Sequence, residues 1–287
     1  SQKTHVHDSA WWEKFIQATR DEFNSLLWQG VMSIIPASLV SEGASIFPAV
    51  WAMGHKQWIL THEGYKWKAR LNLDWSKQVA GWDYNNAYAP VASWERVQML
   101  LCLSLKNDWK TQQLNYDLAF PQAPVKQECY MKIPQGIGIK DNGEWVLKFH
   151  KNIYGQKQGP WVWNQYLIEK LQSIGFVPSD ADENVFYWGR VIYLLYTNNS
   201  IVAAPTNAKI DQVFKLHNLI HEAGLKVTDE GKIKDFLGVK INKVDNKTYH
   251  LSQPHLINQI LEDLNLMGNS VKTKDMAAPS SQCWWHI

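Results

Sequence analysis

Four residues, Tyr196-Thr197-Asn198-Asn199, separate two apolar runs and constrain the fold more than any other stretch of the chain. Val191-Ile192-Tyr193-Leu194-Leu195 precedes them and Ile201-Val202-Ala203-Ala204 follows them. Two β-rich runs joined by two turn-forming residues predict a β-hairpin, because asparagine tolerates the positive φ that such turns require. We therefore expect Asn198-Asn199 to form the turn of a hairpin between two apolar strands.

The composition is that of a globular protein, with 287 residues, 45% apolar residues and a formal net charge of +2. This charge neither requires nor excludes a nucleic-acid partner, which would need a local basic surface. Cys102, Cys129 and Cys283 show no C-x-x-C spacing, so we expect a reducing compartment without disulfides or zinc. No apolar run reaches the roughly 18 residues of a membrane-spanning helix, and no signal peptide is recognised. We expect an intracellular, cytoplasmic protein with no membrane partner.

Hydrophobic periodicity predicts helices and strands in mixed order. The expected helices lie at about residues 10–27, 93–106, 160–174, 210–223 and 254–264. Besides the hairpin, the expected strands lie at about residues 31–35, 49–53, 65–73, 109–116, 128–133, 145–149, 226–228, 236–243 and 248–251. Mixed elements without strict βαβ alternation indicate the α+β class.

Three local patterns refine this prediction. In the strand at 65–73, Lys68 and Arg70 alternate with apolar residues and predict one cationic face. Pro121 and Pro124 are expected to exclude regular structure around them. Residues 1–8 are polar and are expected to form a disordered tail, although their histidines offer metal ligands.

Several short motifs also occur in a fixed order. They are Lys68-Ala69-Arg70-Leu71; Asp83-Tyr84 with Tyr88-Ala89-Pro90-Val91; Gln113-Leu114-Asn115 with Ala119-Phe120; Tyr130-Met131 with Pro134 and Gly136; Tyr154-Gly155-Gln156-Lys157-Gln158 with Trp163; Tyr196–Asn199; Phe236-Leu237-Gly238; and Leu251-Ser252-Gln253. Together they resemble the reverse transcriptase domain of copia-type LTR retrotransposons, from about Trp11 to Asp263. Each motif is weak by itself, and the order and spacing make the resemblance specific.

The resemblance implies a right-hand polymerase architecture with fingers, an antiparallel palm sheet and only the start of a thumb. It divides the chain into the tail at 1–8, fingers and palm at 9–251, and the start of a thumb or connecting segment at 252–287. The implied activity is RNA-directed DNA synthesis, with an RNA template, a DNA primer and deoxynucleoside triphosphates as partners. The implied setting is a virus-like particle in the cytoplasm.

Polymerases of this family hold two Mg²⁺ or Mn²⁺ ions on three aspartates, and the ions stabilise the in-line transfer of a nucleotide. The three matching positions here are Asn115, Asn198 and Asn199. An amide keeps a carbonyl oxygen but carries no charge, whereas Mg²⁺ is bound in such sites through carboxylates and phosphates. Electrostatic stabilisation of this kind contributes several kcal/mol per group. We therefore expect weak or absent metal binding and no catalysis.

Asp117 is the one carboxylate that is a possible substitute ligand. If the strand continued through it, Asp117 would share a face with Asn115 but lie about 6.6 Å further along. That displacement exceeds the tolerance of a catalytic site.

Four further residues match nucleotide-binding positions of the family. Lys68 and Arg70 match residues that meet the triphosphate, Phe120 matches the residue under the sugar, and Gln158 matches a contact to nucleotide and template. Without the resemblance, Lys68 and Arg70 are a solvated strand face, Phe120 is ordinary core, and Gln158 is a surface residue at a helix start.

Two alternatives remain beside a catalytically inactive reverse transcriptase. One is a non-catalytic module that binds nucleic acid, since phosphate contacts need cations rather than aspartates. The other is a domesticated structural or interaction fragment whose partner surface is rich in tryptophan.

Trp75-Ser76 stand where the family has glycines, which predicts strain if the turn requires positive φ.

Overall fold

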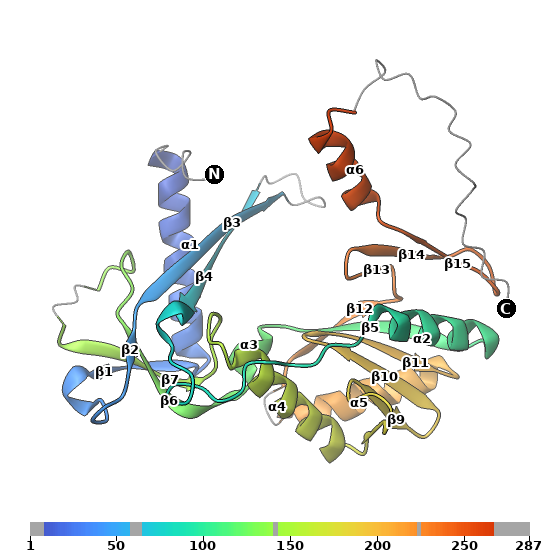
Figure 1. Cartoon of the computed structure of the whole chain (residues 1–287), viewed down its shortest axis with the longest axis horizontal. Coiled ribbons are helices and arrows are strands. Elements are labelled where there is room, and N and C mark those ends of the chain that lie inside the picture. The colour runs from blue at the N-terminus through green and yellow to red at the C-terminus, as the bar shows by residue number, and fades with distance from the viewer. Residues whose placement is uncertain (1–8, 58–64, 140–142, 223–224, 267–287) are drawn as a thin grey trace. The chain divides into compact units, whose positions relative to one another are not determined.

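The computed structural model describes residues 9–57, 65–139, 143–222 and 225–266 (Figure 1). Its helices are α1 (Ser9–Trp28), α2 (Trp94–Lys106), α3 (Ala119–Gln122), α4 (Gly159–Ser173), α5 (Asn207–Glu222) and α6 (Pro254–Asp263), with 3₁₀ turns η1 (Ala37–Leu39) and η2 (Trp75–Lys77). The strands are β1 (Met32–Pro36), β2 (Ile46–Phe47), β3 (Ala49–Gln57), β4 (Tyr65–Leu73), β5 (Lys110–Tyr116), β6 (Pro124–Lys132), β7 (Trp145–Lys151), β8 (Val177–Pro178), β9 (Val185–Trp188), β10 (Val191–Tyr196), β11 (Asn199–Ala204), β12 (Val227–Gly231), β13 (Asp235–Phe236), β14 (Val239–Lys243) and β15 (Tyr249–Ser252). The mixed order confirms the α+β class.

The chain forms two compact units, residues 1–231 and 232–287. The boundary at 251/252 that was predicted from the sequence separates fingers and palm from the start of a thumb. The two compact units do not test that division, which stays a prediction. The tail at 1–8 lies outside the described residues. No helix in the described part of the chain combines the length and apolar character needed to cross a membrane.

The first unit contains a six-stranded antiparallel sheet with the order β12-β5-β11-β10-β9-β8. Alternation along β10 assigns its two faces: Tyr193 and Leu195 pack with residues of α4 and α5, whereas Leu194 lines a small cavity together with Leu100 of α2. In Figure 1, α2 accordingly lies on one side of this sheet, and α4 and α5 lie on the other. This double cover explains why both apolar runs of the hairpin are buried nearly throughout.

The predicted hairpin is confirmed, but its turn is one residue earlier than predicted. β10 and β11 pair from Ile192↔Ala203 to Tyr196↔Asn199, so Asn199 belongs to β11 and the two loop residues are Thr197 and Asn198. Thr197 has φ 53°, and neither asparagine has a positive φ. The loop therefore places the left-handed conformation on a β-branched residue, where glycine is usual.

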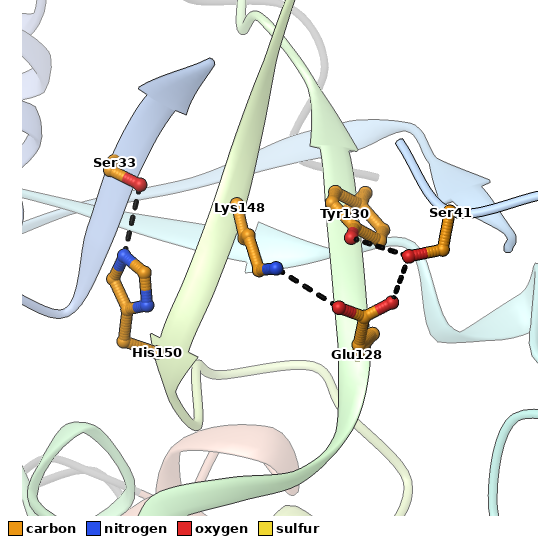
Figure 2. A network of polar contacts seen from close by, with 6 residues as sticks. All are labelled: Ser33, Ser41, Glu128, Tyr130, Lys148 and His150. Carbon is orange, nitrogen blue, oxygen red and sulfur yellow. Dashed lines mark hydrogen bonds and ion pairs between the residues drawn. The ribbon is translucent and has the colours of Figure 1, made fainter. Parts of the chain in front are cut away.

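The first unit also contains a four-stranded sheet, β1-β7-β6-β2, in which only β2–β6 is parallel, and the two-stranded ribbon β3–β4. α1 packs against β4, and its buried face consists of Phe15, Thr19, Phe23 and Leu26. Trp12, three residues before Phe15, is 46% exposed. Figure 2 shows a network of polar contacts among side chains of β1, β6 and β7 and Ser41. In it, Lys148 Nζ forms an ion pair of 2.9 Å with Glu128 Oε1.

Two expectations about turns were wrong. Pro121 lies within α3 and Pro124 begins β6, because a proline in the first turn of a helix or at the start of a strand disrupts no required hydrogen bond. Trp75 and Ser76 lie in η2, capped by the side chain of Asp74, and neither has a positive φ. The strain expected from replacing glycine at these two positions does not arise.

The second unit contains the sheet β13-β14-β15 and helix α6. The single strand predicted at 236–243 is a hairpin instead, with Phe236 paired to Val239. Leu237 and Gly238 form its loop with φ of 53° and 78°, the pattern of a type I′ turn. This turn was not predicted from the sequence because Leu237 is apolar and gives no turn signal.

Candidate functional site

The three asparagines that were predicted to match the family's aspartate positions lie together. Asn115 is the penultimate residue of β5, and the sheet register places it directly opposite Asn199 of β11. The loop residue Asn198 is tied to the same strand, since the backbone N–H of Tyr116 donates to the Asn198 carbonyl at 2.8 Å. Three polar side chains are thus gathered, partly buried, at one end of the sheet.

These side chains form a directional chain of hydrogen bonds. Asn199 Nδ2 donates to Asn198 Oδ1 at 3.5 Å, Asn198 Nδ2 donates to Asn115 Oδ1 at 2.8 Å, and Asn115 Nδ2 donates to Asp117 Oδ1 at 3.3 Å. An ionised carboxylate only accepts hydrogen bonds. Asp117 therefore fixes the direction in which every amide of the chain points.

Asp117 contacts Asn115 although it lies just beyond the end of β5. β5 ends at Tyr116, and Leu118 adopts the left-handed conformation with φ 49°, which is uncommon for a residue other than glycine. Asn115 Nδ2 and Asp117 Oδ1 nevertheless meet at 3.3 Å, and the predicted backbone offset of about 6.6 Å along a strand stays a prediction. The hydroxyl of Thr228 in β12 donates to the second oxygen of Asp117.

Two buried contacts support the hairpin below these amides. The indole Nε1 of Trp163 in α4 donates to the backbone carbonyl of Thr197 at 2.7 Å. The hydroxyls of Tyr116 and Tyr193 lie 2.6 Å apart in the core, and both rings are fully buried. Burial raises the pKa of both phenols, so they stay neutral in the fold. The motif at 154–163 includes Trp163, but only the structure shows that its indole supports the turn.

Arg70 and Phe120 lie on the same aromatic ring, that of Tyr154. The Arg70 guanidinium is 5.4 Å from the centre of the Tyr154 ring, and Phe120 packs edge-on at 5.4 Å. Burial raises the pKa of Tyr154, and the charges of Arg70, Glu22 and Asp117 all act on it. The structure thus brings Arg70 and Phe120 together at Tyr154, which the sequence did not single out as a site residue.

Gly155 allows the backbone of this turn to lie close to β4. The backbone N–H of Leu73 donates to the Tyr154 carbonyl at 2.9 Å. Gly155 has φ 85°, and a Cβ atom there would collide with the backbone carbonyl of Leu73. Glycine is therefore required for β4, which carries Arg70, to approach this turn.

The cationic strand face is confirmed, since Lys68 and Arg70 are exposed while Ala69 and Leu71 are buried. A carboxylate from α1 acts on both cations. Burial raises the pKa of Glu22 more than the charges of Lys68 and Arg70 lower it. Sequence reasoning missed Glu22, although its position between Thr19 and Leu26 on the buried helix face was a signal.

Gln158 is half-buried just before α4 and contacts the segment that follows β4. Gln78 Nε2 donates to Gln158 Oε1 at 3.0 Å, and the backbone N–H of Lys157 donates to Gln78 Oε1 at 2.8 Å. The Lys157 ammonium lies 4.9 Å from the Tyr84 ring centre and 5.5 Å from that of Trp75. Gln158 is thus a positioned residue at an internal contact, not a free surface side chain.

The residues at the amide chain do not fit a pair of divalent cations. The Asn115 and Asn198 carbonyl oxygens already accept amide hydrogen bonds, and Asp117 is the one carboxylate in the chain of contacts. Across the described ranges, no three His, Cys, Asp or Glu side chains form a group able to hold a metal. Hard divalent cations need several anionic or free oxygen ligands.

Residues 39–278 match the model of a protein family described as reverse transcriptase (RNA-dependent DNA polymerase). The match covers most of the 287 residues, so the chain belongs to this family. The identification as a reverse transcriptase domain of a copia-type LTR retrotransposon Pol polyprotein is thereby confirmed.

Curated relatives support the same assignment. The chain is 30% identical over 217 residues to the retrovirus-related Pol polyprotein from transposon RE1 of Arabidopsis thaliana, covering 74% of this chain and 14% of that polyprotein. Identity to the Pol polyprotein from transposon RE2 of the same plant is 27% over 265 residues, or 89% and 17% of the two chains. Identity to that from transposon TNT 1-94 of Nicotiana tabacum is 26%, over 70% and 15%. The chain thus spans 14–17% of the length of these relatives.

Proposed function

We propose that this chain is a reverse transcriptase domain by descent whose polymerase centre is inactive. The observation that carries the proposal is the hydrogen-bonded chain of Asn199, Asn198, Asn115 and Asp117. The three amides occupy the positions of the family's metal-binding aspartates and satisfy one another. The RNA template, DNA primer and deoxynucleoside triphosphates of the ancestral reaction are assigned by family resemblance, as is an intracellular setting.

The geometry explains why amides and carboxylates behave differently here. Two aspartates with oxygens as close as the 2.8 Å between Asn198 Nδ2 and Asn115 Oδ1 would repel unless a cation or proton lay between them. Asparagines at this separation form a hydrogen bond instead. A site that needs cations to be stable has become one that is stable without them. The lost electrostatic stabilisation contributes several kcal/mol per group, enough to abolish turnover.

Within this proposal the six-stranded sheet is the palm, and the ribbon β3–β4 with the four-stranded sheet belongs to the fingers. Residues 9–251 then comprise fingers and palm, and residues 252–287 begin a thumb or connecting segment. The arrangement is supported by the antiparallel hairpin paired to β5 and by the cationic strand β4.

Calorimetric titration with Mg²⁺ and with Mn²⁺ tests the metal half of the proposal. We expect no specific binding by the chain and measurable binding by Asn115→Asp/Asn198→Asp/Asn199→Asp. A matched control adds the same charge elsewhere, at the exposed Asn242, Asn246 and Asn258, and should remain like the unaltered chain. Millimolar or tighter binding by the unaltered chain would refute the assignment of an inactive metal site.

A second candidate function, non-catalytic binding of nucleic acid, is favoured by one observation. Lys68 and Arg70 are exposed on the same strand face, and phosphate contacts need only such cations. If this function exists, affinity for an RNA–DNA hybrid falls steeply with salt, and Lys68→Ala/Arg70→Ala flattens that dependence. Weak binding that does not change with salt would exclude it. Lys106→Ala/Lys126→Ala serves as a control with equal charge loss.

A further inference from the structure

A carboxylate from α1, that of Glu22, lies against the strand that carries Lys68 and Arg70. Helix α1 packs against β4, and Figure 1 shows it beside the β3–β4 ribbon. On the helix, Glu22 is next to Phe23 and one turn after Thr19, and each of these two neighbours is only 3% exposed. Glu22 therefore belongs to the helix face that is turned toward the strand.

The Glu22 carboxylate is partly removed from water without a hydrogen bond to replace it. Its Oε1 atom is buried and accepts no hydrogen bond from the described residues. Burying an ionised carboxylate in this way is costly unless opposite charges offset the cost. The charges of Lys68 and Arg70 supply that offset, with a smaller contribution from the backbone N–H of Leu71. The two cations are thus the main groups that keep Glu22 ionised.

The strand geometry explains how one carboxylate acts on both cations. β4 pairs with β3 along one edge, and at the other edge the N–H of Leu73 donates to the Tyr154 carbonyl at 2.9 Å. Backbone groups alternate between the two edges of a strand, so the N–H of Leu71 points to the same edge as that of Leu73. Glu22 therefore lies at this edge, beside the residue that follows Arg70.

Lys68 and Arg70 remain accessible to dissolved anions. Both side chains are exposed, and the Arg70 guanidinium lies against the Tyr154 ring, 5.4 Å from its centre. A phosphate that contacted these two cations would come close to Glu22 as well. Two negative groups that share the same pair of cations repel each other, and partial burial strengthens the repulsion.

We propose that Glu22 is an autoinhibitory counter-ion, which neutralises part of the charge of Lys68 and Arg70 and so weakens the binding of phosphate-bearing ligands to β4. Removing its charge should strengthen such binding. A residue that only positioned the two cations would have the opposite effect, since its loss would weaken binding. The inference rests on the proposed function only in that Lys68 and Arg70 are taken as anion-binding residues. It requires neither a metal ion nor the amide chain.

Calorimetric titration of the whole chain with inorganic tripolyphosphate tests the proposal, at neutral pH, low salt and without divalent cations. We expect Glu22→Gln to bind about tenfold more tightly than the unaltered chain, because one nearby negative charge is removed from a partly buried setting. Unchanged or weaker binding by Glu22→Gln would overturn the proposal.

Asp21→Asn is the matched control for charge. Asp21 is the preceding residue of the same helix, is exposed, and accepts a hydrogen bond from Gln17. The variant removes the same charge on the solvent side of α1 and should leave the affinity for tripolyphosphate unchanged. An equal gain in Asp21→Asn and Glu22→Gln would show that the net charge of the chain, and not the position of Glu22, controls binding.

Lys68→Ala/Arg70→Ala, made in the unaltered chain and in Glu22→Gln, shows through which residues Glu22 acts. We expect both double substitutions to abolish binding. Full binding without the two cations would refute their anion-binding role and the inference together. Loss of binding without them, combined with no effect of Glu22→Gln, would refute the inference alone.

A second variant keeps the test valid if Glu22→Gln fails to fold by circular dichroism. Glu22→Met replaces the carboxylate by an apolar side chain of similar length, so no polar group is left buried without a partner. It should give the same gain in affinity for tripolyphosphate. No gain in folded Glu22→Met would overturn the proposal.

Discussion

Asn115 and Asn199 lie directly opposite each other on β5 and β11, and Asn198 bridges them by donating to Asn115 at 2.8 Å. Two strands and a turn therefore bring together side chains that are distant in the sequence, since Asn115 and Asn198 are 83 residues apart. The hydrogen-bond chain ends on the carboxylate of Asp117. Under the proposed function, the arrangement of a metal site is retained while its charge is lost.

Substitution of Gly155 by alanine should strongly destabilise the first unit. A Cβ atom at Gly155 meets the Leu73 backbone at positive φ, so the backbone must shift, and we expect a loss of about 3 kcal/mol or more. Urea denaturation followed by circular dichroism measures it. Gly136→Ala, at φ 88° in open space, should cost only about 1 kcal/mol. Equal effects of the two would show that the contact with Leu73 is unimportant.

Replacing Thr197 by glycine should stabilise the fold. Thr197 has φ 53° in the hairpin loop, and strain at such a position costs on the order of 1 kcal/mol. Thr197→Gly should raise the free energy of unfolding by about that amount. Thr197→Ala removes the hydroxyl but keeps a Cβ atom at positive φ, so it should not. A stabilising alanine variant would mean that the hydroxyl, not the backbone, is the source of the strain.

The hydrogen bond from the indole N–H of Trp163 to the Thr197 carbonyl should contribute to the free energy of unfolding. Trp163→Phe leaves the Thr197 carbonyl without its 2.7 Å partner in a buried setting, so we expect a loss of about 2 kcal/mol or more. The matched variant is Trp161→Phe, since Trp161 is partly buried and faces the Lys126 ammonium at 4.5 Å. Its cost should be under about 1 kcal/mol. Comparable unfolding midpoints for the two variants would argue against the role given to Trp163.

Stability should fall at alkaline pH because of Cys129. Burial raises the pKa of this thiol from 9.0 to about 12, so the unfolded chain releases its proton first. The contribution to stability is complete below pH 9 and is lost between pH 9 and 12 at about 1.4 kcal/mol per pH unit. In reducing buffer, the stability difference between the chain and Cys129→Ala should therefore shrink from about pH 9 to 10. A constant difference would contradict the buried, neutral thiol.

The sequence predicted the strands of the hairpin well because their apolar residues are continuous and bounded by polar ones. It placed the turn one residue too late, because the prediction relied on the tolerance of asparagine for positive φ. The register is set instead by the pairing of Tyr196 with Asn199. The hairpin at Leu237-Gly238 was missed for a related reason. An apolar residue in a left-handed conformation carries no turn signal in the sequence.

The resemblance predicted which residues form the candidate site. It did not predict the hydrogen bonds among them. The ordered motifs placed Asn115, Asn198 and Asn199 at the aspartate positions, but the direction of their hydrogen bonds depends on Asp117. The contact between Asp117 and Asn115 is made just past the end of β5, and no periodicity reveals it. Tyr154 and Gln78 were missed as well, because their roles arise from contacts with residues about 80 positions away.

Primer extension tests the central claim most directly. The chain and its Asn115→Asp/Asn198→Asp/Asn199→Asp variant are compared on an RNA template with a DNA primer, in Mg²⁺ and in Mn²⁺. We expect no extension by the unaltered chain, and recovery of extension in the variant would show that the scaffold is intact around an inactive centre. Robust, metal-dependent extension by the unaltered chain would contradict the claim that the three asparagines abolish catalysis.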